Sequence, residues 1–531
     1  MTGTESKPGG IGADLLVAGR IMTGTREVGA VVAGGGKILF AGDAGEAEKR
    51  FSCPRRVEYS GGPVIPGLID AHMHLSATGL GIISHDLRGS GSISEMAGRG
   101  AAMAAEHGFA VSSGWDQELF KERRYPSAAD LDRAEAHRPM ILYRFCTHVA
   151  VVNSRVLEMA GVDAGTPDPP GGMIGRDDAG NPDGLFYDNA VKLHIAPLEE
   201  KLVRPLIGSA VKAAADYAVT RGLTTLTAVN ADIDEIRAVK ALEREGLLRC
   251  RVRFFLSREA FESGAGRMER GEKGGMVRIC GIKLFADGAF GARTALLSSS
   301  YSDMDTRGLR LTEEKEMEAL IRKAAESGLQ AAVHAIGDEG VMAALRSARA
   351  AGPGVTGFRL EHAALTPGPV REMLRGQRPV IVVQPHFLVS DWWLPARLGE
   401  RCRDCYMFLS MLEDGLVLAG SSDAPVEPLD PWTGIIAAMD RGGHDGSPMA
   451  GLTGGEAVGL DDALKMYTSA AAAADGEEGV LGMLEPGAAA DMVFLAGTPS
   501  TGMTTPPGVA ATVVGGKLVY SVDDALSRAF S

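Results

Sequence analysis

Two histidines one residue apart, His72 and His74, end a short apolar segment in the first part of the 531-residue chain. Side chains two positions apart on a β-strand point to the same face, so both imidazoles can reach one metal ion. A His-x-His pair alone is weak evidence, because a surface strand carries such a pair by chance. Its meaning depends on where the other metal-ligating residue types fall.

Three later apolar segments end in residues of the same chemical kind, namely His334, His362 and Asp423. Four of the chain's 11 histidines therefore lie at predicted strand ends, a placement that scattered core histidines would rarely show. Imidazole and carboxylate groups are ligands of Zn²⁺ in proteins. These five residues together predict a metal centre.

Lys283 lies inside the apolar segment 279–285, where a cation needs an explanation. Burial lowers the pKa of an amine, and a neutral amine can add carbon dioxide to become a carbamate. The carbamate is an anion suited to bridging two metal ions. The alternative is a lysine that pairs with Asp287 or reaches solvent.

Eight short apolar segments alternate with helix-like stretches, which predicts an α/β fold of the (β/α)₈ TIM-barrel type. The predicted strands are 64–69, 224–229, 252–256, 279–285, 331–335, 358–361, 380–383 and 416–419. Catalytic residues of such barrels come from the carboxyl ends of several strands, which is where the candidate ligands fall. The hydrolase barrel is expected over 63–484.

Short predicted strands separated by Gly-rich turns occur at both ends of the chain, at 15–17, 30–32, 38–41, 492–495, 511–514 and 517–520. They predict one small β-sandwich domain composed of residues 1–62 and 485–531. About 150 residues separate the first barrel strand from the second, far more than one helix and its loops require. An inserted, substrate-covering subdomain is expected at about 108–205.

Three residues of the insertion, Trp115, Asp116 and His148, are candidates for substrate contact, weighed equally against structural roles. Asp287 and Arg293, beside the lysine strand, either orient the substrate or form an ion pair, and the structural role is favoured. A further pair, Cys402 and Cys405, lacks the second CxxC that a structural zinc site requires, so two ordinary thiols are expected.

The formal net charge of −14 argues against nucleic-acid and anionic-membrane partners. The first 14 residues contain no apolar core of a secretory signal, and no apolar stretch of about 18 residues predicts a membrane span. Six scattered cysteines are typical of a reducing compartment. A cytoplasmic enzyme with a small-molecule substrate is expected, and a homodimer is the default oligomeric state.

The motifs together resemble the YtcJ-like branch of the amidohydrolase superfamily, which is related to N-substituted formamide deformylase. The resemblance covers nearly the whole chain and rests on PGLIDAHMH at 66–74, KLFADGAFGART at 283–294, HAIGD at 334–338, LEHA at 360–363 and SDAPV at 422–426. It also includes the split β-sandwich and the insertion after the first barrel strand.

The resemblance implies a centre with two zinc ions. In it, His72 and His74 hold the more buried ion with Asp423, His334 and His362 hold the second, and Lys283 bridges them as its carbamate. Asp423 would take a proton from the attacking water and pass it to the leaving nitrogen. The implied reaction is hydrolysis of an amide-type C–N bond, with N-substituted formamides or N-acyl compounds as substrate classes.

Two other functions stay open. The first is a one-metal deaminase or cyclic-amide hydrolase, in which Lys283 is unmodified and only His72, His74, one further histidine and Asp423 bind the metal. The second is a metal-stabilised binding or regulatory protein without turnover, against which the presence of a general base such as Asp423 argues.

Overall fold

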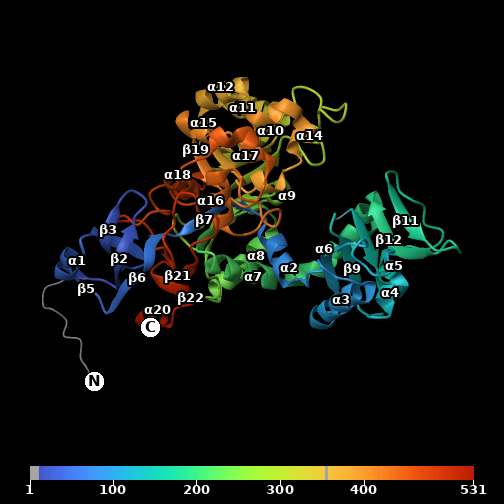
Figure 1. Cartoon of the computed structure of the whole chain (residues 1–531), viewed down its shortest axis with the longest axis horizontal. Coiled ribbons are helices and arrows are strands. Elements are labelled where there is room, and N and C mark those ends of the chain that lie inside the picture. Colours follow the sequence, from blue (N-terminus) through green and yellow to red (C-terminus); the bar gives the residue numbers. More distant parts are fainter. Residues whose placement is uncertain (1–10, 147, 353–356, 531) are drawn as a thin grey trace. The chain divides into compact units, whose positions relative to one another are not determined.

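A computed structural model describes residues 11–146, 148–352 and 357–530 (Figure 1). The chain forms two compact units. One comprises the chain up to Leu75 together with everything from Ala214 onward, and the other is Ser76–Ala213. Residues 1–10 and 531 of the predicted terminal domain lie outside the described residues. None of the helices that the structure describes is long and apolar enough to cross a membrane.

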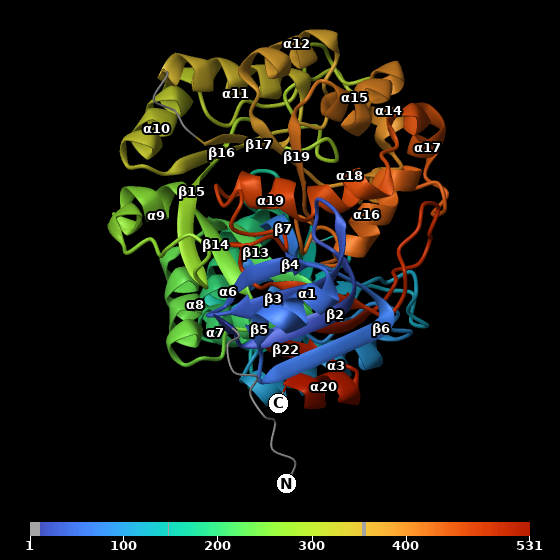
Figure 2. The same ribbon diagram turned by 90° about the vertical axis from the view of Figure 1, so that its left-hand side faces the viewer.

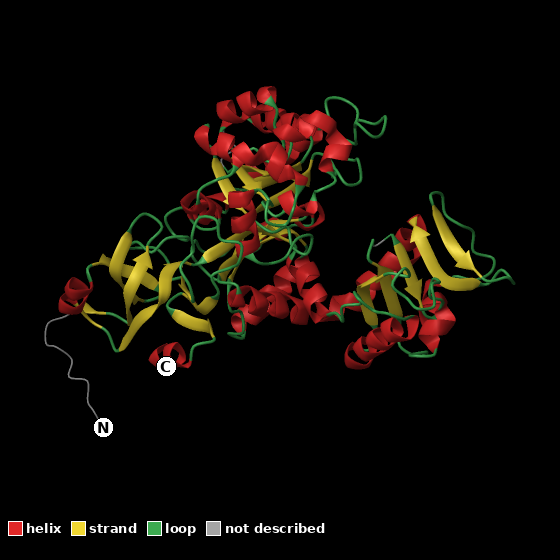
Figure 3. Cartoon of the chain, viewed as in Figure 1, coloured by secondary structure: helices red, strands yellow, loops and turns green. Residues whose placement is uncertain are grey.

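The first unit contains a sheet of eight parallel strands whose spatial order follows the chain order. Figure 3 shows strands of this unit in yellow with helices, in red, around them. The strands are β7 (Leu68–Met73), β13 (Leu223–Ala231), β14 (Arg251–Leu256), β15 (Val277–Phe285), β16 (Gln330–Ala335), β17 (Phe358–His362), β18 (Val380–Val383) and β19 (Val417–Gly420). Every residue of β7 and β14 is buried, as expected of strands covered on both faces. The predicted (β/α)₈ barrel is confirmed.

The edge strands β7 and β19 meet where their chains leave the barrel. Asp423 donates its backbone N–H to the carbonyl of His72 at 2.8 Å, and His74 donates to the carbonyl of Ala424 at 2.7 Å. These hydrogen bonds join the first and last strands at their carboxyl ends. They also place the predicted ligands of the two strands side by side.

The first barrel strand was predicted at 64–69, but the structure divides that segment. The strand β6 (Arg55–Pro66) ends before Gly67, and β7 begins after it. A Cβ at Gly67 would lie 2.2 Å from Thr224 Oγ1, so only glycine fits where the chain passes from one sheet to the other. The predicted boundary at residue 62 therefore falls inside β6.

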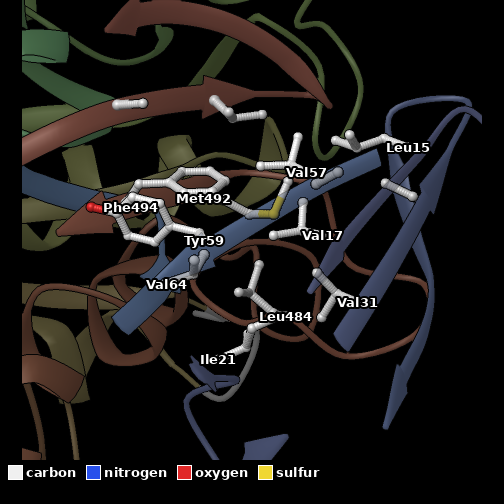
Figure 4. Close-up of a cluster of buried hydrophobic side chains, with 14 of the residues drawn as sticks. Leu15, Val17, Ile21, Val31, Val57, Tyr59, Val64, Leu484, Met492 and Phe494 are labelled. Carbon is white, nitrogen blue, oxygen red and sulfur yellow. The ribbon is translucent and has the colours of Figure 1, made fainter. Parts of the chain in front are cut away.

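Strands from both ends of the chain form one seven-stranded sheet, in the order β22-β21-β20-β6-β2-β3-β4. They are β2 (Leu15–Met22), β3 (Glu27–Gly34), β4 (Lys37–Gly42), β20 (Met492–Leu495), β21 (Val509–Val514) and β22 (Lys517–Ser521). The long strand β6 pairs with β2 on one side and with β20 on the other. Figure 2 shows β2 and β6 next to each other. Side chains from both ends, among them Val17, Tyr59, Met492 and Phe494, fill a common core (Figure 4).

The second unit, Ser76–Ala213, extends beyond the predicted insertion at about 108–205 at both ends. Its five-stranded sheet has the order β11-β12-β10-β9-β8, formed by β8 (Ala110–Trp115), β9 (Met140–Arg144), β10 (Val149–Val152), β11 (Gly172–Arg176) and β12 (Pro182–Asp188). The helix α3 (Ile93–His107) packs Met96 and Met103 into the same core as Leu142 of the sheet. The inserted unit therefore includes α3, which lies before residue 108.

The helix α4 (Ala128–Asp132) of this unit is held by Asp130, which accepts hydrogen bonds from Arg124 at 2.6 and 2.8 Å and from the backbone N–H of Ser127 at 2.9 Å. The hydrogen bonds from Arg124 lower the pKa of Asp130 to about 2. Replacing Asp130 with asparagine should reduce the free energy of unfolding by about 1–3 kcal/mol at pH 7.

The pH dependence of this effect has a definite sign. Because the pKa of Asp130 is lower in the folded state, its contribution is complete above the unfolded value of about 4 and is lost as the pH falls toward about 2. Denaturant unfolding of the wild type and the variant from pH 7 to pH 3 checks this. A stability difference that stays constant below pH 4 would contradict it.

Candidate metal centre

Three of the predicted ligands converge at the carboxyl ends of β7 and β19. The Nε2 atoms of His72 and His74 lie 3.3 Å and 3.2 Å from Oδ1 of Asp423. One ligand atom from each of the three residues lies within 4.8 Å of the other two. Among the described residues, this is the single group of three or more His, Cys, Asp or Glu side chains with spacing suited to a metal ion.

His72 is oriented by the carboxylate of Glu361, a residue to which the sequence pattern assigns no role. Its Nδ1 lies 2.5 Å from Oε2 of Glu361, and both side chains are buried. When Nδ1 donates to the carboxylate, the Nε2 atom of the neutral ring presents a lone pair toward His74 and Asp423. Burial opposes the ionisation of Glu361, but Arg359 and His72 outweigh it and hold its pKa well below the usual range.

The histidines of β16 and β17 adjoin this group. The ring centroids of His334 and His362 lie 4.4 Å apart, and those of His362 and His72 lie 5.0 Å apart. Burial lowers the pKa of His334 to about 3 and that of His362 well below its ordinary value. Both rings are therefore neutral near pH 7 and can offer a nitrogen lone pair to a metal ion.

Hydrogen bonds also fix which nitrogen each of these rings offers. His334 donates from Nε2 to the carbonyl of Gly288 at 3.0 Å, and His362 donates from Nδ1 to Oε1 of Gln384 at 2.7 Å. The amide of Gln384 is oriented in turn by its 2.9 Å hydrogen bond to Ser421 Oγ. Nδ1 of His334 and Nε2 of His362 remain as ligand atoms, as is usual when outer partners orient metal-binding histidines.

Lys283 is 1% exposed, and its Nζ finds no hydrogen-bond partner within the described part of the chain. Lys283 therefore neither pairs with Asp287 nor reaches solvent. The alternative in which it is an ordinary paired or solvated lysine is wrong. Burial lowers its pKa to about 8, against the opposing influence of Glu361 and Asp423. A buried amine without a partner is unstable unless it is modified or compensated.

The donor set fits a divalent cation such as zinc. Burial opposes the ionisation of Asp423, but His72 and His74 outweigh it and hold its pKa well below the usual range. Its Oδ1 nevertheless receives no well-directed hydrogen bond from the residues described. An ionised, buried oxygen that faces two imidazole rings is compensated when a cation lies between them.

Two of these ligands also have unusual backbone conformations, with φ of +72° at His362 and +57° at Asp423. Such conformations cost residues other than glycine about 1–3 kcal/mol each and cluster at functional sites. The strained backbone at these two positions is therefore consistent with a functional site, in which the placement of the two side chains matters more than local backbone stability.

Asp287 and Arg293 do not form an ion pair with each other. Arg293 pairs instead with Asp303, at 3.1 Å from Nε and 2.8 Å from Nη2. The buried carboxylate of Asp287 accepts three backbone hydrogen bonds, from Leu296, Ile336 and Gly337. These partners favour a structural role for both residues, with Asp287 holding the loop that follows His334.

The candidate contacts in the inserted unit differ in exposure. Trp115 is fully buried in the core of that unit, and its indole N–H donates to the carbonyl of Leu142 at 2.8 Å, which favours its structural role. Asp116 is half-buried beside Arg144, whereas His148 is exposed and lies 3.0 Å from Asp188. His148 and Asp116 remain the candidates that a ligand can reach.

The segment after β18, which includes the short helix α13 (Phe387–Ser390), carries polar groups to which the sequence assigns no role. His386 and Ser390 both hydrogen-bond to Glu427, which follows β19. The neighbouring ring of Phe387 stacks on His362, with centroids 6.4 Å apart and an interplanar angle of 20°. Only their location in the sequence could have pointed to these residues, because they follow β18, a barrel strand for which no ligand is predicted.

Comparisons with known proteins agree with this geometry. Residues 59–520 match the model of the amidohydrolase family. The chain is 31% identical over 510 residues to the putative amidohydrolase YtcJ of Bacillus subtilis (strain 168), covering 91% of this chain and 94% of the relative. It is 26% identical over 527 residues to an N-substituted formamide deformylase of Arthrobacter pascens, covering 92% and 94%.

A solved structure extends the likeness to three dimensions. The crystal structure of an uncharacterized metal-dependent hydrolase from Pyrococcus horikoshii OT3 superposes with a TM-score of 0.81 at 29% sequence identity. The match covers 93% of this chain and 99% of that one.

Proposed function

The chain belongs to the amidohydrolase family of metal-dependent hydrolases, and from this premise we propose that it uses two zinc ions to hydrolyse the C–N bond of a small amide. The observation that carries the proposal is the convergence of His72, His74 and Asp423, with His334 and His362 adjoining them. The chemistry of this donor set suits zinc.

Bound zinc supplies Lewis acidity, which lowers the pKa of water and polarises a substrate carbonyl. Within the protein, the ionised Asp423 accepts the proton of the attacking water at Oδ1 and then delivers it to the leaving nitrogen. Water adds to the carbonyl carbon as the C–N bond breaks, and an acid and an amine leave. The imidazoles keep their orientation because Glu361, Gly288 and Gln384 hold their outer nitrogens.

Lys283 acts in this proposal as a carbamate. Its amine adds to carbon dioxide with formation of an N–C bond and release of one proton, giving an anion that would hold the metal together with the histidines and Asp423. Two observations support this role. Nζ lies 5.3 Å from the centroid of the Phe285 ring but has no hydrogen-bond partner among the described residues. Its pKa of about 8 leaves a useful neutral fraction near pH 7.

N-substituted formamides are the proposed first substrate class, because a relative covering most of both chains is named for that activity. The segment from His386 to Ser390, which includes α13 (Phe387–Ser390), is the proposed source of substrate contacts in the unit that holds the metal ligands. Substrate contact by His148 and Asp116 of the insertion stays a prediction. A small-molecule substrate without nucleic-acid or membrane partners, a cytoplasmic location and a homodimer stay predictions.

A substrate screen tests the proposal. Zinc-loaded enzyme is incubated with N-formyl, N-acyl, ureido and cyclic-amide compounds, and the released amine, ammonia or acid is quantified. We expect turnover of N-formyl or N-acyl compounds that a chelator abolishes and added zinc restores. Turnover confined to cyclic amides or amino-heterocycles with one bound ion would favour the one-metal alternative. Zinc binding with no turnover of any C–N compound would favour the binding protein.

A further inference from the structure

A row of buried charged groups extends from His72 away from the ligand atoms. Arg359 donates to both oxygens of Glu361, from Nε at 2.5 Å and from Nη2 at 3.2 Å. Its Nη1 donates to Oδ1 of Asp475 at 3.0 Å, and Oδ2 of that residue accepts a 2.8 Å hydrogen bond from Thr227. All of these side chains are at most 1% exposed. The row thus joins β7, β13 and β17 to the end of α19 (Ser469–Ala474).

Arg359 contacts the ligand strand in a second way. Its Nη2 also donates to the carbonyl of Ala71 at 2.6 Å, the residue directly before His72. The guanidinium group lies over the ring of Phe255 at 4.2 Å, which limits its movement. One rigid cation therefore fixes both the backbone that carries His72 and the carboxylate that orients its ring.

A comparable buried pair close by lacks this connection. Glu477 is also fully buried and accepts hydrogen bonds from Arg253 at 2.8 Å and from Arg278 at 3.1 Å. Its hydrogen-bond partners within the described residues include no candidate metal ligand. This second network resembles the first in its charges, although the Arg278 side chain is 19% exposed. It contacts the first network through the hydrogen bond from Arg278 to the backbone carbonyl of Asp475 at 3.1 Å. The difference is the bond from Glu361 to His72.

We infer that Arg359, Glu361 and Asp475 form a relay of positioning residues that sets the orientation of His72 toward the metal, an inference that rests on the zinc site proposed above. A carboxylate that accepts the Nδ1 proton makes the opposite nitrogen a stronger ligand. Arg359 holds that carboxylate in place with two hydrogen bonds, and Asp475 holds Arg359. The relay accordingly acts through His72 and does not touch the substrate.

Zinc affinity, measured by competition with a chromophoric chelator, tests the relay. Glu361→Gln keeps an oxygen that can accept from His72 but removes the charge, and it should weaken zinc binding by about 10–100-fold. Asp475→Asn, one step further away, should weaken it in the same direction but less. Glu477→Gln is the matched control and should bind zinc as the wild type does.

The visible absorption spectrum of the cobalt-substituted protein gives a second measurement that a purely structural role would not change. Glu361→Gln and Asp475→Asn should alter the ligand-field bands, whereas Glu477→Gln should not. Thermal unfolding of the metal-free proteins should show all three variants destabilised, because each loses a charged partner of a buried arginine. If Glu361→Gln does not fold, Asp475→Asn and its spectrum decide the question.

Two outcomes would overturn the relay. One is wild-type zinc affinity in Glu361→Gln, and the other is an equal loss in Glu477→Gln, which would mean that affinity follows fold stability alone. The measurements do not use turnover. A chain that binds zinc through the relay but hydrolyses no C–N bond would therefore refute the proposed function and leave this inference standing.

Discussion

Replacing Asp423 with asparagine is expected to abolish C–N bond hydrolysis, with a fall in kcat/KM of at least about 10²–10⁴-fold. Asp423 is buried and ionised, and its Oδ1 lies within 3.3 Å of the Nε2 atoms of His72 and His74. An asparagine amide has nearly the same shape but cannot accept the proton of water. Steady-state kinetics at saturating zinc, on the best substrate of the screen, measure the effect.

A control variant, Asp491→Asn, separates the loss of Asp423 as a general base from a general loss of protein stability. Asp491 is also a buried carboxylate, but it pairs with Arg251 at 2.7 and 2.9 Å in the segment that leads into β20. Asp491→Asn should unfold more readily while its folded fraction keeps normal kcat/KM. Zinc content is measured in each protein, because Asp423 is also a candidate ligand. Unchanged activity in zinc-loaded Asp423→Asn would refute the mechanism.

Replacing Lys283 with methionine is expected to reduce bound zinc from two ions per chain toward one. Methionine fills the buried space but cannot form a carbamate, so the bridging anion is lost. Two-metal chemistry contributes several kcal/mol to catalysis, so activity should fall by at least about 100-fold. Metal analysis of the purified protein, paired with kinetics, measures both effects.

The requirement for carbon dioxide gives this prediction a specific signature. Wild-type protein depleted of both metal and carbon dioxide should regain its second ion and its activity faster when bicarbonate is added with zinc. At a fixed concentration of dissolved carbon dioxide, the rate should rise with pH up to about 8, because only the neutral amine reacts. Lys283→Met should not respond, whereas the exposed Lys273→Met should behave as the wild type. If the wild-type protein is fully active with one zinc ion per chain, a two-zinc site bridged by Lys283 is contradicted and the one-metal alternative is supported.

Local sequence patterns determined the barrel and the identity of the candidate ligands. An apolar run such as 380–383 forms β18 with the predicted bounds, because a strand covered on both faces needs only continuous apolar residues. His72, His334 and Asp423 could be assigned to the same rim because the carboxyl ends of parallel strands meet there. These inferences depend on residue type and on spacing within one segment.

Tertiary structure alone decided which groups surround those ligands. Glu361 reaches His72 across 289 positions of sequence, and Gln384 reaches Ser421 across 37, so no local pattern could pair them. The isolation of the Lys283 amine likewise depends on every side chain packed around it. The identity of the candidate ligands can be predicted from side-chain alternation within each strand and from strand order. Their orientation, ionisation and hydrogen-bond partners depend on contacts that form only when the barrel folds.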